Sequence, residues 1–155
     1  MTSLFDIQTC VLGAFRDGSH IVYAIQVCAG PHETRVHRRY SAFAQLKKIA
    51  LRLLTTGPCC HQRSCHLDSV LRSVFDEIDL DSFRVINTEK LVQHRIAKLH
   101  FFLQRMHDAL LKCPGRPRRL SEAHGCKVTK LIKSFLDIAR PSTWEGEDSN
   151  RLALI

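Results

Sequence analysis

The sequence predicts an α+β fold in which a three-stranded antiparallel sheet is followed by a helical subdomain. Residues 4–15, 21–28 and 34–40 are strand-like runs joined by short turns, which favours antiparallel pairing of neighbours. From residue 41 onward, apolar residues recur at helical spacing. Because all the predicted strands precede all the predicted helices, the order is typical of α+β rather than parallel α/β proteins.

The strands are bounded by turn residues. The first run, residues 4–15, alternates imperfectly between apolar and polar side chains, and the Asp-Gly-Ser sequence at 17–19 ends it. The second run is rich in Ile, Val and Tyr and ends at the Ala-Gly-Pro-His sequence of residues 29–32. The third run, residues 34–40, is polar and basic.

Four helices are expected after the sheet. Ser41 is the predicted N-cap of the first, which residues 55–58 (Thr-Thr-Gly-Pro) end. A short helix is expected over residues 66–75, a long one over 88–112 and a last one over 127–139. The long helix carries an apolar stripe that needs a partner surface, which the sheet can supply: Val92, Ile96, Leu99, Leu103, Met106 and Leu110.

Length and charge limit the possible functions. We expect residues 1–140 to form one domain and residues 141–155 a mobile tail, since 155 residues suit a single domain. The net charge of +8 and the pI near 9.4 favour polyanions, either nucleic acid or the anionic face of a membrane. They argue against an acidic chaperone or a calcium buffer. No apolar run approaches the ~20 residues of a membrane span.

The N-terminus and the cysteines indicate a cytoplasmic protein. Asp6 interrupts the first apolar stretch and no basic region precedes it, so no secretory signal is predicted. Seven cysteines, an odd number, speak against a closed disulfide framework and favour free thiols.

The exit of the third strand carries the first candidate site. Arg38 and Arg39 are adjacent, so they point to opposite faces of the strand, and one of them can face a pocket beside the helices. A guanidinium matches the oxygens of a phosphate, and the flat ring of Tyr40 can pack against a sugar or inositol ring. The alternative is a basic edge strand with Tyr40 as an ordinary core aromatic.

Arg95, in the first half of the long helix, is the second candidate. It precedes the stripe residue Ile96, so it should border the packed face, with its stem over the core and its head at the edge. The alternative is a solvated or ion-paired surface arginine.

Together these two segments resemble the phox-homology (PX) family. Residues 38–43 (RRYSAF) are similar to the RRYSxF motif that closes the third strand of that fold, and residues 95–103 are similar to its helical R-x-x-x-L-x-x-F-L pattern. The resemblance covers about residues 4–138. It is greatest to divergent PX domains of microbial eukaryotes, which carry a Cys-bearing insertion, here residues 59–65, and a Cys-led last helix, here Cys126.

The resemblance implies a phosphoinositide-binding module, most often for the 3-phosphorylated form, peripheral on endosomal or other intracellular membranes. Arg39 would hold the 3-phosphate, Tyr40 would pack under the inositol ring and Arg95 would bind ring hydroxyls. A further basic residue normally precedes the long helix, and here Arg84, then Lys90, would take that place. The phosphoinositide isomer is left open.

The membrane loop of the family departs from its usual form in this chain. Its proline-rich sequence is missing, because no proline lies between Pro58 and Pro114. Leu71, Val74 and Phe75 are the candidates for membrane insertion, with a core role as the alternative. A PX fold that has lost lipid binding and serves as a protein-interaction module is therefore the alternative function.

Other classes have weaker support. Cys60, Cys65 and His66 form a weak zinc alternative, since no C-x-x-C pair is present and further ligands would have to come from elsewhere. We expect no metal and no cofactor. The cluster Arg116, Arg118 and Arg119 suits a nucleic-acid backbone, but no RNP-like strand or helix-turn-helix pattern accompanies it. No P-loop, GxSxG or HExxH motif is present, so an enzyme is not expected.

Overall fold

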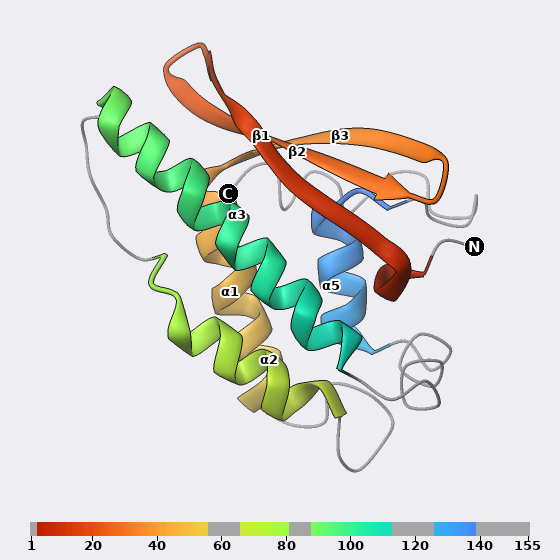
Figure 1. The fold of residues 1–155 in the computed structure, drawn as a ribbon. Helices are drawn as coiled ribbons and strands as arrows, with labels where there is room; N and C mark the ends of the chain where they lie inside the picture. The colour runs from red at the N-terminus through yellow and green to blue at the C-terminus, as the bar shows by residue number, and fades with distance from the viewer. Residues whose placement is uncertain (1–2, 56–65, 81–87, 113–125, 139–155) are drawn as a thin grey trace.

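Three antiparallel strands form the sheet, in the order β1-β2-β3. The computed structural model describes residues 3–55, 66–80, 88–112 and 126–138 (Figure 1). Strand β1 spans Ile7–Asp17, β2 spans His20–Ala29 and β3 spans His32–Arg39. The turns between them place Gly18 at φ 59° and Gly30 at φ 61°, a left-handed conformation that glycine adopts without a steric penalty. The predicted three-stranded antiparallel sheet is confirmed.

A bulge in β1 explains the imperfect alternation of its sequence. The register shifts between Val11 and Gly13, so that Leu12 is the extra residue. Before the bulge, the odd-numbered residues Ile7, Thr9 and Val11 are buried against the helices. After it the parity is reversed, and Phe15 lies across from Val22 on the opposite face.

The start of the chain differs from the prediction. Residues 4–6, expected as the beginning of the first strand, form the short 3-10 helix η1 (Leu4–Asp6), because the Ser3 hydroxyl accepts a hydrogen bond from the Phe5 N–H. This turn buries both Leu4 and Phe5, which neighbouring positions of a strand, pointing to opposite faces, would not do.

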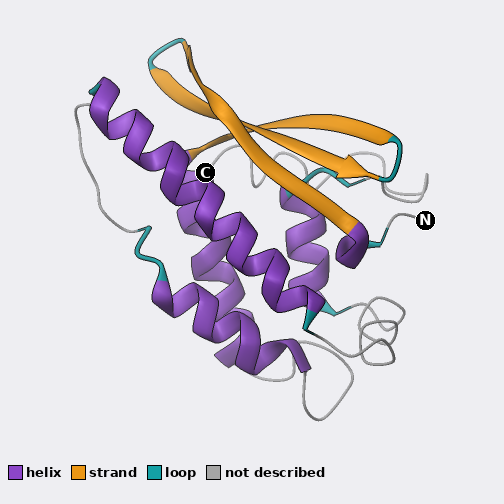
Figure 2. Cartoon of the chain, viewed as in Figure 1, coloured by secondary structure: helices purple, strands orange, loops and turns teal. Residues whose placement is uncertain are grey.

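The helices lie on one side of the sheet (Figures 1 and 2). They are α1 (Tyr40–Thr55), α2 (His66–Glu77), α3 (Glu89–Leu111) and α5 (Lys127–Phe135). All four expected helices are present. Helix α1 begins at Tyr40, one residue before the predicted cap Ser41, which therefore lies inside the helix. The predicted tail, residues 141–155, lies outside the described residues.

Helix α3 packs along β1 and against α2. The Thr88 hydroxyl caps it by accepting the Leu91 N–H at 3.2 Å, close to the predicted start. Its buried face is rotated from the predicted stripe, since Val92 and Ile96 are only half-buried. The buried residues are Arg95, Leu99, Phe102, Leu103, Met106, Ala109 and Leu110.

Side chains engage a few backbone groups of both edge strands. On β1, His100 Nδ1 accepts the Val11 N–H at 3.3 Å and Gln104 Nε2 donates to the Thr9 carbonyl at 2.7 Å. On β3, the Arg38 side chain donates to the His37 carbonyl of its own strand and to the Phe135 carbonyl at the end of α5. Such contacts occupy backbone groups that would otherwise be open to pairing with another chain.

None of the described helices is both long and apolar enough to cross a bilayer.

Candidate functional site

The junction of β3 and α1 separates the two adjacent arginines. Arg38 faces the helices: its Nε donates to the Phe135 carbonyl at 3.0 Å, and its Nη1 donates to the His37 carbonyl at 3.0 Å. The Arg38 Cζ also lies 5.7 Å from the centroid of the Phe135 ring. Burial lowers the pKa of Arg38 from its usual value, and the charge of Asp137 acts in the opposite direction. The arginine beside the helical half is therefore Arg38, and it fastens β3 to α5.

We expect Arg38→Ala to destabilise the fold without removing the candidate site. The substitution leaves the carbonyl of Phe135 without this donor and removes the contact with its ring, which together should cost about 1–3 kcal/mol. Urea unfolding followed by circular dichroism measures this loss. An unchanged midpoint would show that Arg38 does not fasten β3 to α5.

Arg39 is exposed on the opposite face of the strand. Because Val36 and Arg38 face the helices, strand alternation directs Arg39 away from them, and in register it stands across from Val22. It makes no hydrogen bond or ion pair with the part of the chain that the structure describes. Its guanidinium is accessible, and its role in binding stays a prediction.

Tyr40 and Arg95 come together at the start of α1. The Cζ of Arg95 lies 4.0 Å from the centroid of the Tyr40 ring, a cation–π contact worth about 2 kcal/mol or more when desolvated. Arg95 is 7% exposed, so it occupies a core row of α3 rather than the border of the packed face that the sequence predicted. The structure thus joins Tyr40 and Arg95, 55 positions apart (95 minus 40), and leaves Arg39 adjacent to Tyr40.

Tyr23, which the sequence analysis did not single out, completes this cluster from β2. Its ring lies 6.4 Å from that of Tyr40, centroid to centroid, and its side chain is fully buried. Burial raises the pKa of Tyr23, while the nearby positive charge of Arg95 acts in the opposite direction. The alternation of Tyr23, Ile25 and Val27 along β2 could have marked it as a helix-facing residue.

This pKa shift predicts a loss of stability at alkaline pH. The folded state holds the Tyr23 proton more tightly than the unfolded chain, so this contribution is complete below about pH 10 and falls as the pH rises through the folded pKa. Tyr23→Phe should flatten this alkaline decline. Urea unfolding of both proteins between pH 8 and pH 11 tests it, and identical declines would rule out Tyr23 as their source.

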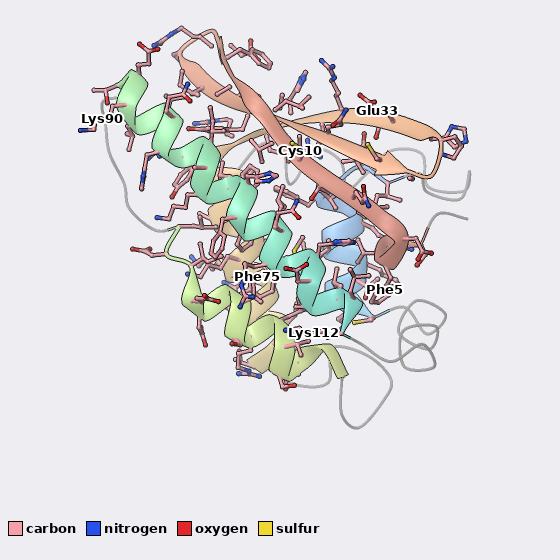
Figure 3. The ribbon with its side chains drawn as sticks, in the orientation of Figure 1. Phe5, Cys10, Glu33, Phe75, Lys90 and Lys112 are labelled. Carbon is pink, nitrogen blue, oxygen red and sulfur yellow. The ribbon has the colours of Figure 1, made fainter. Side chains whose placement is uncertain are left out.

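The structure describes one of the two remaining predicted headgroup ligands. Lys90 is exposed in the first turn of α3, about 7.5 Å along the helix axis from Arg95 (Figure 3). Arg84 lies outside the described residues.

The prediction of membrane insertion by Leu71, Val74 and Phe75 is wrong. All three side chains are buried, with exposed fractions of 0–4%. They form the face of α2 that packs on α1 and α3, and Phe75 lies 5.7 Å from Phe102, centroid to centroid. The alternative core role is the one that the structure shows.

The zinc alternative finds no support in the described residues. They contain no group of three or more His, Cys, Asp or Glu side chains that could hold a metal ion. Cys60 and Cys65 lie outside the described residues, as does the side chain of His66.

Lys47 is a second buried cation that sequence reasoning missed. It is 9% exposed, and its Nζ donates to the Ile78 carbonyl at 2.9 Å, just beyond the end of α2. Its position in the apolar row of α1, four residues after Phe43 and three before Ala50, was the available signal.

Comparisons with known proteins add no assignment. No family model matches the chain, and no curated protein matches it.

Proposed function

We propose that this chain binds the headgroup of a phosphoinositide at the β3–α1 junction, most favourably a 3-phosphorylated one, and so attaches to intracellular membranes such as those of endosomes. The observation that carries the proposal is the position of the Arg95 guanidinium over the Tyr40 ring, directly after the exposed Arg39 in the chain. A guanidinium on an aromatic ring suits a phosphorylated ring of hydroxyls, and the proposal requires the Arg39 side chain, which points to the other face of β3, to reach around the end of the strand.

Each residue has a distinct part in this proposal. Arg39, which is exposed and uncommitted among the described residues, would bind the phosphate through its forked donors. Tyr40 would give the inositol ring a flat apolar surface, and Arg95, held by Tyr40, would meet the ring hydroxyls. Lys90 would add positive charge from the first turn of α3, and Arg84, which precedes that helix in the sequence, would be a further basic ligand.

Two arginines bind a headgroup too weakly on their own, so the membrane surface must also contribute to the affinity. Charge-assisted hydrogen bonds contribute about 1.5–3 kcal/mol each, so two arginines supply roughly 3–6 kcal/mol, which corresponds to dissociation constants from several millimolar to tens of micromolar. The net charge of +8 adds diffuse attraction of about 1 kcal/mol for each basic residue near an anionic surface. Since Leu71, Val74 and Phe75 are buried, they contribute no inserted apolar surface, and binding should depend strongly on salt.

A protein-interaction module without lipid binding is the second candidate. Two observations favour it: Arg95 is 7% exposed, and the three candidates for insertion are core residues. A nucleic-acid-binding domain and an enzyme remain less favoured on sequence grounds alone.

Vesicle titration separates these candidates. We expect vesicles with phosphatidylinositol 3-phosphate to bind at least about tenfold more tightly than phosphatidylserine vesicles of equal surface charge. Equal binding to the two kinds of vesicle would be explained by diffuse electrostatic attraction alone and would contradict a headgroup site. No binding to either would favour the protein-interaction module, and steeply salt-dependent binding to random DNA without lipid selectivity would favour nucleic acid.

A further inference from the structure

The outer face of the sheet carries a row of basic side chains. None of the described helices covers this face, and Figure 3 shows Glu33 projecting from β3 on the side away from the helices. Arg35, His37 and Arg39 share the alternation of Glu33 and are all exposed. We call these three residues the basic row. Their side chains are about 6.6–6.8 Å apart along the strand.

The one carboxylate in line with the basic row on β3 is Glu33, at its Arg35 end, and the facing strand adds none. In register, Arg35 stands across from Gln26, His37 from Ala24 and Arg39 from Val22. Within the described residues, neither Arg35 nor Arg39 forms an ion pair. The surface is open and positively charged, with an apolar border where Phe15, 44% exposed, lies 5.0 Å from His37, ring centroid to centroid.

The sequence offers a complementary segment of the same chain. Residues 144–148 read Trp-Glu-Gly-Glu-Asp, with three carboxylates in five positions. Glu145 and Glu147 are two residues apart, so in an extended conformation their spacing equals that of the basic row. We call residues 144–148 the acidic segment; it lies outside the described residues.

The end of α5 brings the acidic segment within reach. Arg38 ties the Phe135 carbonyl to β3, so the chain continues past Ile138 from a point beside this strand. Glu145 is seven positions after Ile138 (145 minus 138), and an extended chain of that length spans up to about 25 Å. Strand β3, with eight residues, is about 26 Å long.

We propose that the acidic segment of this chain docks on the basic row of β3. The contact is intramolecular, so a tether of this length supplies an effective concentration in the millimolar range. Exposed ion pairs are individually weak and screened by salt, so docking is partial and reversible. Because Arg39 belongs to the basic row, the docked acidic segment competes with an anionic membrane, a consequence that rests on the proposed function.

Spectra of the full chain without lipid test the docking. We compare ¹⁵N–¹H spectra of the wild type with those of a triple variant, Glu145→Gln, Glu147→Gln and Asp148→Asn. The amide resonances of residues 33–39 should shift in this variant, and 0.5 M NaCl should move the wild-type resonances toward the same positions. Unchanged β3 resonances would overturn the proposal.

A charge-matched control separates docking from a general charge effect. Asp76→Asn, Glu89→Gln and Asp108→Asn remove three exposed carboxylates from helices and change the net charge equally. This control should leave the β3 resonances in place, and equal shifts in both variants would contradict docking. A peptide of residues 142–150, added at millimolar concentration to the triple variant (hereafter the tail variant), should restore the wild-type shifts. If it does not, the acidic segment is not what binds the basic row.

Other occupants give different results. Shifts that depend on protein concentration would place the acidic segment of one copy on another copy and would overturn the intramolecular contact. If the β3 resonances shift only when vesicles or DNA are added, the basic row binds an external polyanion, and the intramolecular contact is again overturned.

If docking holds, the tail variant should bind anionic vesicles about two- to tenfold more tightly than the control variant. Loss of vesicle binding in every variant would instead contradict the proposed function and leave the docking result intact.

Discussion

Replacing Arg39 by alanine is expected to abolish binding to phosphoinositide vesicles while the fold stays intact. Arg39 is exposed and makes no contact among the described residues that folding requires. If it holds a phosphate through two charge-assisted hydrogen bonds, its loss costs about 3 kcal/mol or more, a weakening of roughly 100-fold. Liposome co-sedimentation measures the binding, and thermal unfolding confirms that stability is unchanged.

Arg38→Ala is the matched control for this experiment. The two variants lose the same charge from adjacent positions, but Arg38 is committed to Phe135 and His37, whereas Arg39 is not. We therefore expect Arg39→Ala to lose binding with little change in stability, and Arg38→Ala to lose stability with little change in binding. Co-sedimentation that Arg39→Ala leaves unchanged, or that both variants weaken equally, would refute a specific phosphate contact at Arg39.

Replacing Phe75 by alanine is expected to destabilise the fold by about 3–5 kcal/mol. The ring is 0% exposed and packs against Phe102 between α2 and α3, so the substitution leaves a cavity that these helices cannot fully close. Such a loss is a large fraction of the 5–15 kcal/mol that typically separates folded from unfolded states. Urea unfolding at neutral pH measures it directly.

Phe101→Ala is the control for the core substitution. Phe101 lies on the same helix as Phe102 but is 50% exposed, so its removal should change stability by less than about 0.5 kcal/mol. A small effect of Phe75→Ala, together with weaker vesicle binding, would contradict the core position of α2 and return Phe75 to the membrane-contacting role.

Periodicity predicts the elements of this fold well because burial imposes it. Composition and turn residues located β2 and β3, and the helical spacing located α3 to within one residue at each end. The bulge at Leu12 was visible as imperfect alternation, but not as a reversal of the faces. The 3-10 turn at Leu4 depends on a single side-chain cap and has no periodic signal.

The sequence indicates which residues could form the candidate site, but not how the fold arranges them. Alternation separates Arg38 from Arg39, but it cannot tell which face the helices cover, because that depends on how β3 pairs with β2. Arg95 was placed at the border because it precedes the predicted stripe residue Ile96, but the buried face of α3 is rotated to include Arg95, and the Tyr40 ring that it contacts comes from a distant segment. Leu71, Val74 and Phe75 form an apolar helix face that suits a core and a membrane equally until the packing partners are known.

Titration with the soluble headgroup inositol 1,3-bisphosphate tests the central claim most directly. The claim predicts that the Tyr40 ring resonances and the side-chain N–H resonances of Arg39 and Arg95 shift together, with one dissociation constant, in the absence of any membrane. Shifts confined to Arg39, with Tyr40 and Arg95 unmoved, would contradict a shared headgroup site at the β3–α1 junction.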